Sequence, residues 1–461
     1  MDSIYLQDNT DGFDGSALKE KPVLAVVANP EGEIFELPGF QAVGMEGKTL
    51  TPLLKKNTVP IPHGGELMFL PGRKPVVYDM KQKKIITLSN NPFMPSETVY
   101  PVAAFNSPGY VQGYMAAYEE RKNAPHLPLF SYGAVGWCED GFYTTAILVD
   151  PENRQDLRLM SRSKVVAGVK AMKTKIPNNK LRLHLEKCAL TYGCPAAKNF
   201  FIGRFEAPLP TSKACNARCL GCLSLQKHAE IKSPQERIMF TPSPDDIAEL
   251  ALYHIGRVKN AIVSFGQGCE GEPLMAAEAI IPAVRKIRKE TDKGTINFNT
   301  NGSMPEVIGE LADAGIDSIR VSINSLQEIP YETYFRPMNY RFSDVISGID
   351  TAISKKIFVS INYLNSPGFT DSKDEVTAFT SFLENHPIHF IQWRNLNYDP
   401  LRYWDIMGKI KELKTPMGMA DLMKHIRNAY PGVGFGYFNP PKENFPFISR
   451  NYRELNGLSI D

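Results

Sequence analysis

The sequence predicts an α/β protein in which a partial, TIM-like (β/α)6 barrel follows a smaller β-rich α+β domain. From about residue 205, apolar strand-like runs alternate with helix-like runs six times, an order typical of a parallel sheet. Before residue 160, short β-rich runs are separated by Pro/Gly turns such as NPEG at 29–32. The chain has 461 residues, of which 43% are hydrophobic, enough for two or three domains with a sizeable core.

These patterns of strand-like and helix-like runs divide the chain into four segments. Residues 1–160 form the β-rich domain, and residues 161–204 form a helical connector. Residues 205–412 form the barrel, and residues 413–461 form a C-terminal helix with an irregular tail rich in Pro, Phe, Tyr and Asn. The connector is predicted to be helical because Leu, Leu and Ala recur at helical spacing in NKLRLHLEKCAL before a glycine stop signal.

The barrel elements follow from apolar runs and helix caps. Ser243 followed by Pro244, for example, is a typical helix start. Strands are expected at 204–211, 260–266, 295–300, 317–324, 357–364 and 388–397. Helices are expected at 243–255, 272–290, 304–315, 342–356 and 372–386. In such folds the chemistry lies at the C-terminal ends of the strands, so residues there are the candidate site.

Charge and hydropathy exclude some classes of protein. The formal net charge is +2, which indicates no bulk polyelectrolyte partner. The first residues, MDSIYLQDNTDGFDG, lack the basic start and apolar stretch of a signal peptide. No apolar run has the length of a membrane span. We therefore expect a cytoplasmic protein without a membrane partner.

Three of the seven cysteines, Cys215, Cys219 and Cys222, form a C-x3-C-x2-C motif. A secreted disulfide framework would spread its cysteines in pairs, so this grouping indicates metal instead. Incidental buried thiols and a zinc site completed by His228 are two alternatives. A cuboidal iron–sulfur cluster uses one thiolate for each iron, so three thiolates would leave one iron open to bind a substrate or cofactor.

The cysteine motif, placed after the first strand of a βα series, resembles that of the radical S-adenosylmethionine (radical SAM) enzyme superfamily. The resemblance covers roughly residues 205–410. It implies that the three cysteines bind a 4Fe-4S cluster whose open iron binds S-adenosyl-L-methionine. Reductive cleavage would then give a 5′-deoxyadenosyl radical that abstracts hydrogen from an unknown substrate. A one-electron reductant such as flavodoxin or ferredoxin is implied as a partner.

Further stretches support the resemblance in the right order. The loop SFGQGCEGEPL resembles the family's GGEP motif, with Glu270 where the first glycine usually stands. NTNGS and RVSIN close the third and fourth strands, where polar residues of the family contact the cofactor. One departure is Gly221, since the family often has an aromatic residue before the third cysteine. The resemblance implies these cofactor-binding residues: Gly271, Glu272, Pro273, Thr300, Asn301, Ser322 and Asn324.

The remaining cysteines allow several interpretations. Cys188, Cys194 and Cys269, with or without Cys138, are candidates for a second, auxiliary iron–sulfur cluster. The alternative is that they are small buried hydrophobic residues. A third reading makes Cys269 a reactive thiol, because it lies within the predicted cofactor loop.

The end of the sixth strand supplies candidate substrate contacts. Arg394, Asn395 and Asn397 are expected to face the barrel mouth, where an arginine could clamp a carboxylate or phosphate. A structural salt bridge across the rim is the alternative. Tyr334 and Arg336 follow the fourth strand and are weaker candidates, because aromatic residues there are more often packing. No histidine is singled out as a catalyst.

Three functions therefore compete. The first is a radical SAM enzyme, either an oxidoreductase or a transferase. The second is an iron–sulfur electron-transfer or redox-sensing protein without SAM chemistry, which would need no cofactor pocket. The third is a zinc-stabilised nucleic-acid-binding protein, which the balanced charge disfavours.

Overall fold

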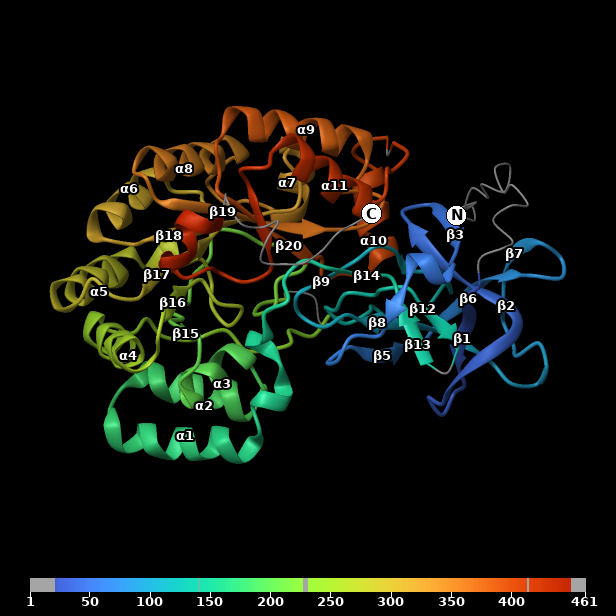
Figure 1. Ribbon diagram of the computed structural model, residues 1–461, viewed down its shortest axis with the longest axis horizontal. Helices are drawn as coiled ribbons and strands as arrows, with labels where there is room; N and C mark the ends of the chain where they lie inside the picture. The colour runs from blue at the N-terminus through green and yellow to red at the C-terminus, as the bar shows by residue number, and fades with distance from the viewer. Residues whose placement is uncertain (1–20, 140, 227–230, 413, 449–461) are drawn as a thin grey trace.

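The computed structural model describes residues 21–139, 141–226, 231–412 and 414–448. Both the polar N-terminal stretch and His228, the candidate fourth zinc ligand, lie outside the described residues. Figure 1 shows an antiparallel β-rich region beside a helix-covered parallel sheet, with a separate group of helices below that sheet. The predicted fold class, a partial barrel with an N-terminal β-rich domain, is confirmed.

The N-terminal region is built on a 12-stranded sheet whose main path runs β11-β6-β2-β1-β12-β13-β4. All of its named strand pairs are antiparallel, and β14 pairs with β9 in a separate two-stranded sheet. The strands are β1 (Leu24–Ala28), β2 (Ile34–Glu46), β3 (Thr49–Pro52), β4 (Val59–Pro60), β5 (Glu66–Phe69), β6 (Arg73–Asp79), β7 (Lys84–Thr87), β8 (Tyr100–Phe105), β9 (Tyr110–Gln112), β10 (Met115–Ala116), β11 (Tyr118–Glu120), β12 (Val135–Cys138), β13 (Gly141–Thr144) and β14 (Ala146–Leu148).

The connector is helical, as predicted. It contains α1 (Arg162–Lys175), α2 (Lys180–Leu190) and α3 (Pro195–Ile202). The side chain of Asn179 caps α2 by accepting from the Arg182 amide, and its own amide donates to the Asp246 carbonyl of α4 at 2.8 Å. The third helix was not predicted. The connector is thereby fixed to the first helix of the barrel.

The barrel sheet has seven parallel strands in sequence order, β15 to β21. Its strands are β15 (Glu206–Pro208), β16 (Ile262–Phe265), β17 (Thr295–Thr300), β18 (Ser318–Ile323), β19 (Phe358–Asn365), β20 (Phe390–Asn395) and β21 (Gly434–Gly436). Its helices are α4 (Pro244–Arg257), α5 (Ala277–Glu290), α6 (Pro305–Ala314), α7 (Glu328–Phe335), α8 (Phe342–Ser354), α9 (Lys373–Asn385), α10 (Pro400–Gly408), α11 (Met419–Ala429) and α12 (Phe445–Ile448).

All six predicted strands and five predicted helices of the barrel are present. The 3-10 helix η5 (Pro273–Ala276) takes the first turn of the helix expected from 272. The prediction of an irregular tail after the C-terminal helix was wrong in one respect. Part of that tail forms β21, which pairs in parallel with β20 through Ile391 and Phe435. The strand was missed because its sequence, Gly-Phe-Gly at 434–436, shows almost no apolar pattern. It is recognised only by its pairing with β20.

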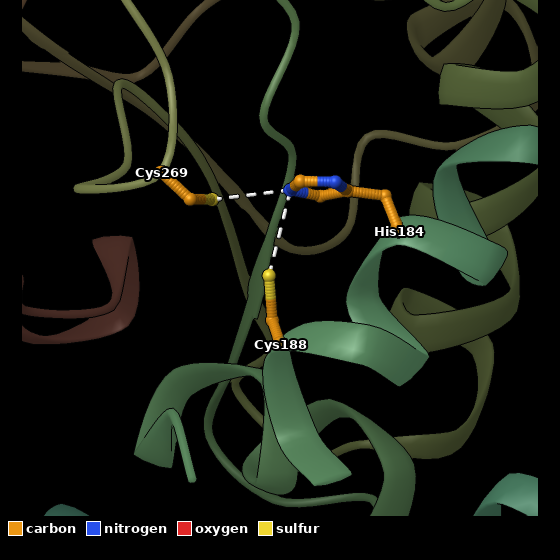
Figure 2. A group of neighbouring side chains, drawn as sticks. All are labelled: His184, Cys188 and Cys269. Atoms are coloured by element: carbon orange, nitrogen blue, oxygen red, sulfur yellow. Dashed lines mark hydrogen bonds between the residues drawn. The ribbon is translucent and has the colours of Figure 1, made fainter. Parts of the chain in front are cut away.

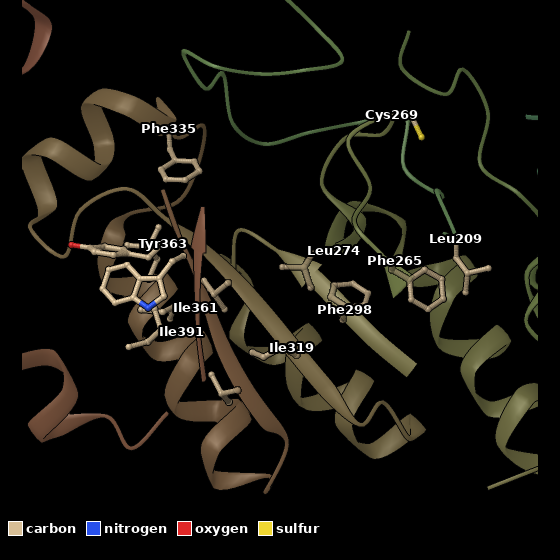
Figure 3. Close-up of a cluster of buried hydrophobic side chains, with 14 of the residues drawn as sticks. Leu209, Phe265, Cys269, Leu274, Phe298, Ile319, Phe335, Ile361, Tyr363 and Ile391 are labelled. Carbon is tan, nitrogen blue, oxygen red and sulfur yellow. The ribbon is translucent and has the colours of Figure 1, made fainter. Parts of the chain in front are cut away.

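Alternation along the strands separates the core from the barrel interior. In β18, Ile319, Val321 and Ile323 are buried, whereas Arg320 and Ser322 between them are half-buried. Figure 3 shows Ile319 in the cluster of buried hydrophobic side chains that runs along the sheet. The polar side chains of the strands therefore point to the opposite face, toward the barrel interior.

The N-terminal region docks on the barrel through buried polar contacts. Arg73, which is fully buried, pairs with Asp399 at 2.8 Å and with Glu120 at 2.9 Å. The Tyr118 hydroxyl also donates to Asp399, at 2.8 Å. Removing one partner would leave a buried charge uncompensated, so these contacts fix how the two regions meet. Within the described residues, no helix combines the length and the apolar character needed to span a bilayer.

Candidate active site

The three motif cysteines lie on the loop that follows β15, and all are half-buried. Burial, together with the neighbouring Cys215 and Cys222, raises the pKa of the Cys219 thiol. Arg237 lies against Cys222, with Nη2 3.6 Å from Sγ. Three neighbouring thiols beside an arginine are a donor set that fits an iron–sulfur cluster, since iron would bind the thiolates and the arginine would offset their charge.

Backbone hydrogen bonds join the cysteine loop to the GEP loop after β16. The Gly271 amide donates to the Ser212 carbonyl at 2.7 Å, and the Glu272 amide donates to the Ala214 carbonyl at 2.9 Å. A Cβ atom at Gly271 would lie 1.9 Å from the Ala214 oxygen, so a larger residue would force the two loops apart. The glycine is therefore required by this close approach.

Glu270, which departs from the family pattern, holds the same two loops together. Its buried carboxylate accepts backbone hydrogen bonds from Thr211 at 2.7 Å, Ser212 at 2.9 Å and Gln267 at 2.7 Å. The pKa of this carboxyl is nevertheless raised, because burial outweighs the hydrogen bonds. At the position where the family usually has a glycine, this chain therefore has a carboxylate that accepts hydrogen bonds from three backbone amides.

Glu272, Thr300 and Asn301, predicted as cofactor contacts, lie together at the ends of β16 and β17. The buried Glu272 carboxylate accepts from the Thr300 hydroxyl at 2.5 Å and from the Asn301 amide at 2.8 Å. The Asn301 side chain donates to Asn216 of the cysteine loop at 2.8 Å. Burial raises the pKa of Glu272 to about 7, which places its titration near neutral pH.

The two predicted residues from β18 and its end have different surroundings. Ser322 is half-buried and accepts a hydrogen bond from Asn362 of β19 at 3.3 Å. Asn324 is fully buried, and its amide donates to the Pro330 carbonyl and to the Tyr403 hydroxyl, each at 3.2 Å. Ser322 therefore borders the cavity described below, whereas Asn324 contacts α7 and α10.

Tyr334 of α7 occupies the space beside Gly221. A Cβ atom at Gly221 would lie 2.7 Å from the Tyr334 hydroxyl, closer than carbon and oxygen normally approach. The backbone of α7 is tied to the cysteine loop, because the Leu220 amide donates to the Tyr334 carbonyl at 3.0 Å. An aromatic ring is thus present next to the loop, but it comes from another element.

A cavity of about 440 Å3 opens between the cysteine loop and the C-terminal ends of the strands. Cys219, Cys222 and Tyr334 border one side of it. The strands contribute the following polar residues: Glu206, Asn299, Arg320, Ser322, Asn362, Arg394, Asn395 and, beyond β21, Tyr437 and Asn439. The sulfur ligands and a polar chamber therefore share one space.

Two arginines give this chamber positive charge. Arg320 donates to Gln392 at 3.0 Å, while its Nε has no hydrogen-bond partner among the described residues. Arg394 stacks on Tyr437, with 3.8 Å from guanidinium carbon to ring centre, and its Nε is likewise unpartnered there. Burial and the nearby Arg394 lower the pKa of Arg320 to about 9.

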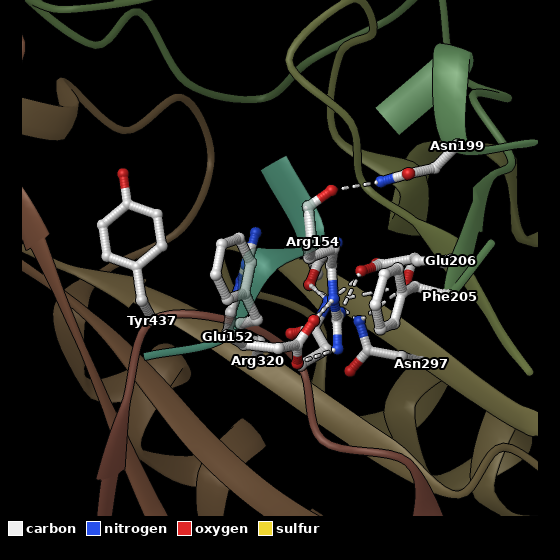
Figure 4. A network of polar contacts seen from close by, with 12 residues as sticks. Glu152, Arg154, Asn199, Phe205, Glu206, Asn297, Arg320 and Tyr437 are labelled. Carbon is white, nitrogen blue, oxygen red and sulfur yellow. Dashed lines mark hydrogen bonds and ion pairs between the residues drawn. The ribbon is translucent and has the colours of Figure 1, made fainter. Parts of the chain in front are cut away.

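The acidic groups close to this chamber have their own partners. Figure 4 shows Arg154 between Glu152 and Glu206, with Arg320 and Tyr437 nearby. Arg154 contacts Glu152 at 2.7 Å and Glu206 at 2.8 Å. Arg154 offsets only part of the charge of these two carboxylates, and Glu206, which also lines the cavity, acts on the charge of Arg320.

The other two predicted substrate residues also border the cavity. Asn395 accepts from the Gln112 amide at 2.9 Å and donates to the Tyr110 carbonyl at 3.0 Å, so its side chain joins β20 to β9. Asn397 lies in the loop after β20 and is half-buried. Asn395 is thus engaged in docking the N-terminal region, whereas Arg394 faces the cavity.

Two further cavities lie outside the barrel interior. One, of about 730 Å3, also reaches Cys219 and Cys222, and is lined by Arg218, Arg237 and Arg336. The other, of about 880 Å3, is formed by N-terminal residues and contains none of the motif cysteines. Among these three cavities of the described residues, the barrel cavity is the one that Cys219, Cys222 and the strand ends line together.

The remaining cysteines are divided between two places. Cys138 is buried in β12 of the N-terminal sheet. Cys188 of α2 and Cys269 of the GEP loop come together with His184, as Figure 2 shows. Cys194 lies at the start of α3, where the backbone amides of Ala196 and Ala197 face its sulfur, although burial dominates and raises its thiol pKa.

Sequence reasoning missed His184, and it named Tyr334 only as a weaker candidate for a substrate contact. The spacing of His184 and Cys188, four residues apart on a predicted helix, did place both on one face. Nothing in the sequence placed Cys269 opposite that face. The position of Tyr334 beside Gly221 could not be predicted, because it depends on where α7 lies against the cysteine loop.

Comparison with known proteins agrees with this geometry. Residues 209–380 match the model of the radical SAM superfamily. GTP 3′,8-cyclases from Brucella ovis and Brucella abortus are 24% and 28% identical to the chain over 250 residues, which cover 50% of this chain and 68% of each relative.

Solved structures are similar to parts of the chain at lower identity. Native anSMEcpe with bound AdoMet gives a TM-score of 0.33 at 18% identity, covering 41% of this chain and 52% of that one. The FeFe-hydrogenase maturase HydG from Carboxydothermus hydrogenoformans gives 0.34 at 15% identity, covering 61% and 70%. This chain therefore spans about half the length of anSMEcpe. The family match places a radical SAM domain at residues 209–380, the part of the chain that contains the cysteine loop and strands β16 to β19 of the parallel half-barrel.

Proposed function

We propose that this protein uses a 4Fe-4S cluster on Cys215, Cys219 and Cys222 to cleave S-adenosyl-L-methionine, and that the product radical abstracts hydrogen from an anionic substrate in the barrel cavity. The observation that carries the proposal is that Cys219 and Cys222 border the same 440 Å3 cavity as the polar strand ends. An electron carrier would need no such chamber, so the carrier alternative is not favoured.

When bound, the reduced cluster and the cofactor supply a 5′-deoxyadenosyl radical. The chain's residues hold and orient these groups. Cys215, Cys219 and Cys222 would hold the cluster, and with only three thiolate ligands it would keep one iron open to the cofactor. Glu272, Thr300 and Asn301 join the ends of two strands at the cofactor's expected position, and Ser322 faces the same chamber. We assign Gly271, Pro273 and Asn324 supporting roles in the backbone around that position.

Tyr334 is proposed to supply the aromatic surface that Gly221 lacks. Its ring lies against the cysteine loop and borders the cavity. An aromatic ring beside the cluster offers a flat apolar surface to an adenine. The close contact between Tyr334 and Gly221 supports the proposal that the ring of Tyr334 takes the place of an aromatic side chain at position 221.

The substrate is proposed to carry a carboxylate or phosphate. Arg320 and Arg394 each have an Nε without a partner in the described part of the chain, and a guanidinium binds such groups through paired hydrogen bonds. Asn397 is proposed to add a polar contact at the mouth, and Asn395 to set the position of the strand end. The GTP 3′,8-cyclase relatives are named for a triphosphate substrate, which belongs to the same chemical class.

One partner and one further cofactor remain proposals. A one-electron reductant of the flavodoxin or ferredoxin type would reduce the cluster. A second iron–sulfur cluster on Cys188, Cys194 and Cys269 was the interpretation of the sequence. The structure groups Cys188 and Cys269 with His184, and this grouping is the basis of the further inference below.

The test is an anaerobic assay of cofactor cleavage. Reconstituted protein is reduced with dithionite, mixed with S-adenosyl-L-methionine, and assayed for 5′-deoxyadenosine by liquid chromatography. We expect the product in the wild type, and expect none with Cys219→Ala. Pools of phosphorylated or carboxylated metabolites should stimulate its formation, and Arg394→Gln should lose that stimulation.

Two results would contradict the proposal. Absence of 5′-deoxyadenosine under every pool, with an intact cluster, would leave an electron carrier as the better assignment. Stimulation by uncharged metabolites alone, unaffected by Arg394→Gln, would overturn the anionic substrate while leaving the cofactor chemistry in place.

A further inference from the structure

A second sulfur site lies behind the cofactor loop, built from His184, Cys188 and Cys269. His184 and Cys188 are one turn apart on α2, and Cys269 lies on the loop that leads to Gly271. Their ligand atoms all lie within 4.8 Å of one another. Figure 2 shows the imidazole and both thiols pointing toward a common point. Cys188 and Cys269 are buried, and His184 is half-buried.

The distances within this group match the edges of a tetrahedral metal site. His184 Nε2 lies 3.4 Å from Cys269 Sγ and 3.4 Å from Cys188 Sγ. Zinc–sulfur bonds of about 2.3 Å and zinc–nitrogen bonds of about 2.0 Å, at the tetrahedral angle, give a nitrogen–sulfur separation of about 3.5 Å. Two of the three donor separations therefore already suit one ion, and the third, between the two sulfurs, is under 4.8 Å.

This compactness disfavours a second cuboidal cluster. In such a cluster each thiolate binds its own iron. The cysteine sulfurs must therefore lie farther apart than donor atoms that bind one and the same ion. Cys194, the third cysteine of the predicted auxiliary cluster, is not part of the compact group. Its place is taken by an imidazole, and a mixed set of thiolates and imidazole is typical of zinc.

We propose that His184 Nε2, Cys188 Sγ and Cys269 Sγ bind one zinc ion that fastens the connector helix α2 to the cofactor loop. The ion is distinct from the iron–sulfur cluster, and the inference does not depend on cofactor cleavage. Its role is positional, because Cys269 immediately precedes Glu270, whose carboxylate binds three loop amides. The helix itself is anchored to α4 through Asn179, so the loop gains a fixed support.

The test measures zinc and iron in purified full-length protein by mass spectrometry. To keep zinc out of the cluster loop, the three motif cysteines are replaced together by alanine. In that background we expect one zinc per chain, lost in Cys188→Ser and in His184→Ala. Cys138→Ser, which alters a buried cysteine in the N-terminal sheet, is the matched control and should retain the ion.

A second measurement avoids the risk that a variant fails to fold. X-ray absorption at the zinc edge of the same background protein should report two sulfur ligands and at least one imidazole nitrogen. Replacement by Co2+ should give the visible absorption of a tetrahedral thiolate site.

The proposal is overturned by any of three results. Zinc could be absent from the background protein after growth with added zinc. Iron and sulfide bound in this background, and lost with Cys188→Ser, would establish a second cluster instead. A Cys188–Cys269 disulfide found in protein purified without oxygen would show that the thiols are paired with each other.

Discussion

The two sulfur sites of this protein are assembled in different ways. Cys215, Cys219 and Cys222 lie within eight residues on one loop, whereas His184, Cys188 and Cys269 come from a helix and a distant loop. The first site borders the cavity, and the second lies behind the cofactor loop. Under the two proposals above, the local motif would present an open metal centre to a ligand, and the assembled site would support the loop beside it.

The largest expected effect is the separate loss of each metal. Cys219→Ala removes one of only three thiolates, so it should abolish the 4Fe-4S cluster and its brown colour. Cys188→Ser should remove zinc and leave the iron content intact. Both metals are measured in the same preparations. Loss of iron from Cys188→Ser protein, with Cys138→Ser unaffected, would mean that the two sites are not independent.

The next largest effect concerns the contact between the cysteine loop and the GEP loop. Gly271→Ala places a methyl group against the Ala214 carbonyl, so the loops must separate and lose two backbone hydrogen bonds. We expect a loss of about 2 kcal/mol in the free energy of unfolding, at about 1 kcal/mol for each bond. Urea denaturation measures the change.

Gly256→Ala is the matched control for this substitution. Gly256 lies in α4, and a Cβ atom there meets nothing within 4 Å. Alanine should stabilise that helix by about 0.5–1 kcal/mol. Equal tolerance of alanine at both glycines would contradict the close approach at Gly271.

A smaller effect is expected at Tyr334. Tyr334→Leu removes the ring beside the cysteine loop and should weaken S-adenosyl-L-methionine binding three- to tenfold, corresponding to about 0.5–1.5 kcal/mol for an aromatic contact. Tyr334→Phe keeps the ring and should bind nearly as the wild type does. Calorimetric titration of the reconstituted protein with the cofactor measures both. Equal binding by the leucine variant would remove Tyr334 from the cofactor site.

The smallest effect on either sulfur site is expected from a change at the interface with the N-terminal region. Burial and the charges of Asp371 and Asp421 raise the pKa of Glu46 from 4.5 to about 8. A raised carboxyl pKa means that the folded protein binds more protons, so stability from this group is present below pH 4.5 and is lost as pH rises through about 8.

Glu46→Gln should therefore raise the thermal midpoint by several degrees at pH 8.5 and change it little at pH 4.5. Iron and zinc contents should stay at wild-type levels. Differential scanning calorimetry at the two pH values measures the stability change. A midpoint shift of equal size at both pH values would show that ionisation of Glu46 is not its cause.

The local features of this molecule were predictable, and the assembled ones were not. Six strands and the three-cysteine loop followed from apolar runs and spacing, which depend on neighbouring residues alone. The seventh strand, Gly434–Gly436, carries no pattern of its own and exists through pairing with β20. Likewise, Cys269 joins His184 only because the loop after β16 folds back against α2. Tyr334 meets Gly221 for the same reason, since two segments distant in sequence meet in the fold.

The most direct test of the central claim is the electron paramagnetic resonance spectrum of the reduced cluster, recorded with and without S-adenosyl-L-methionine. Three thiolate ligands leave one iron open, so the spectrum of the wild type should change when the cofactor binds that iron. A spectrum that stays the same at saturating cofactor, as expected for a fully ligated cluster in an electron carrier, would contradict the account.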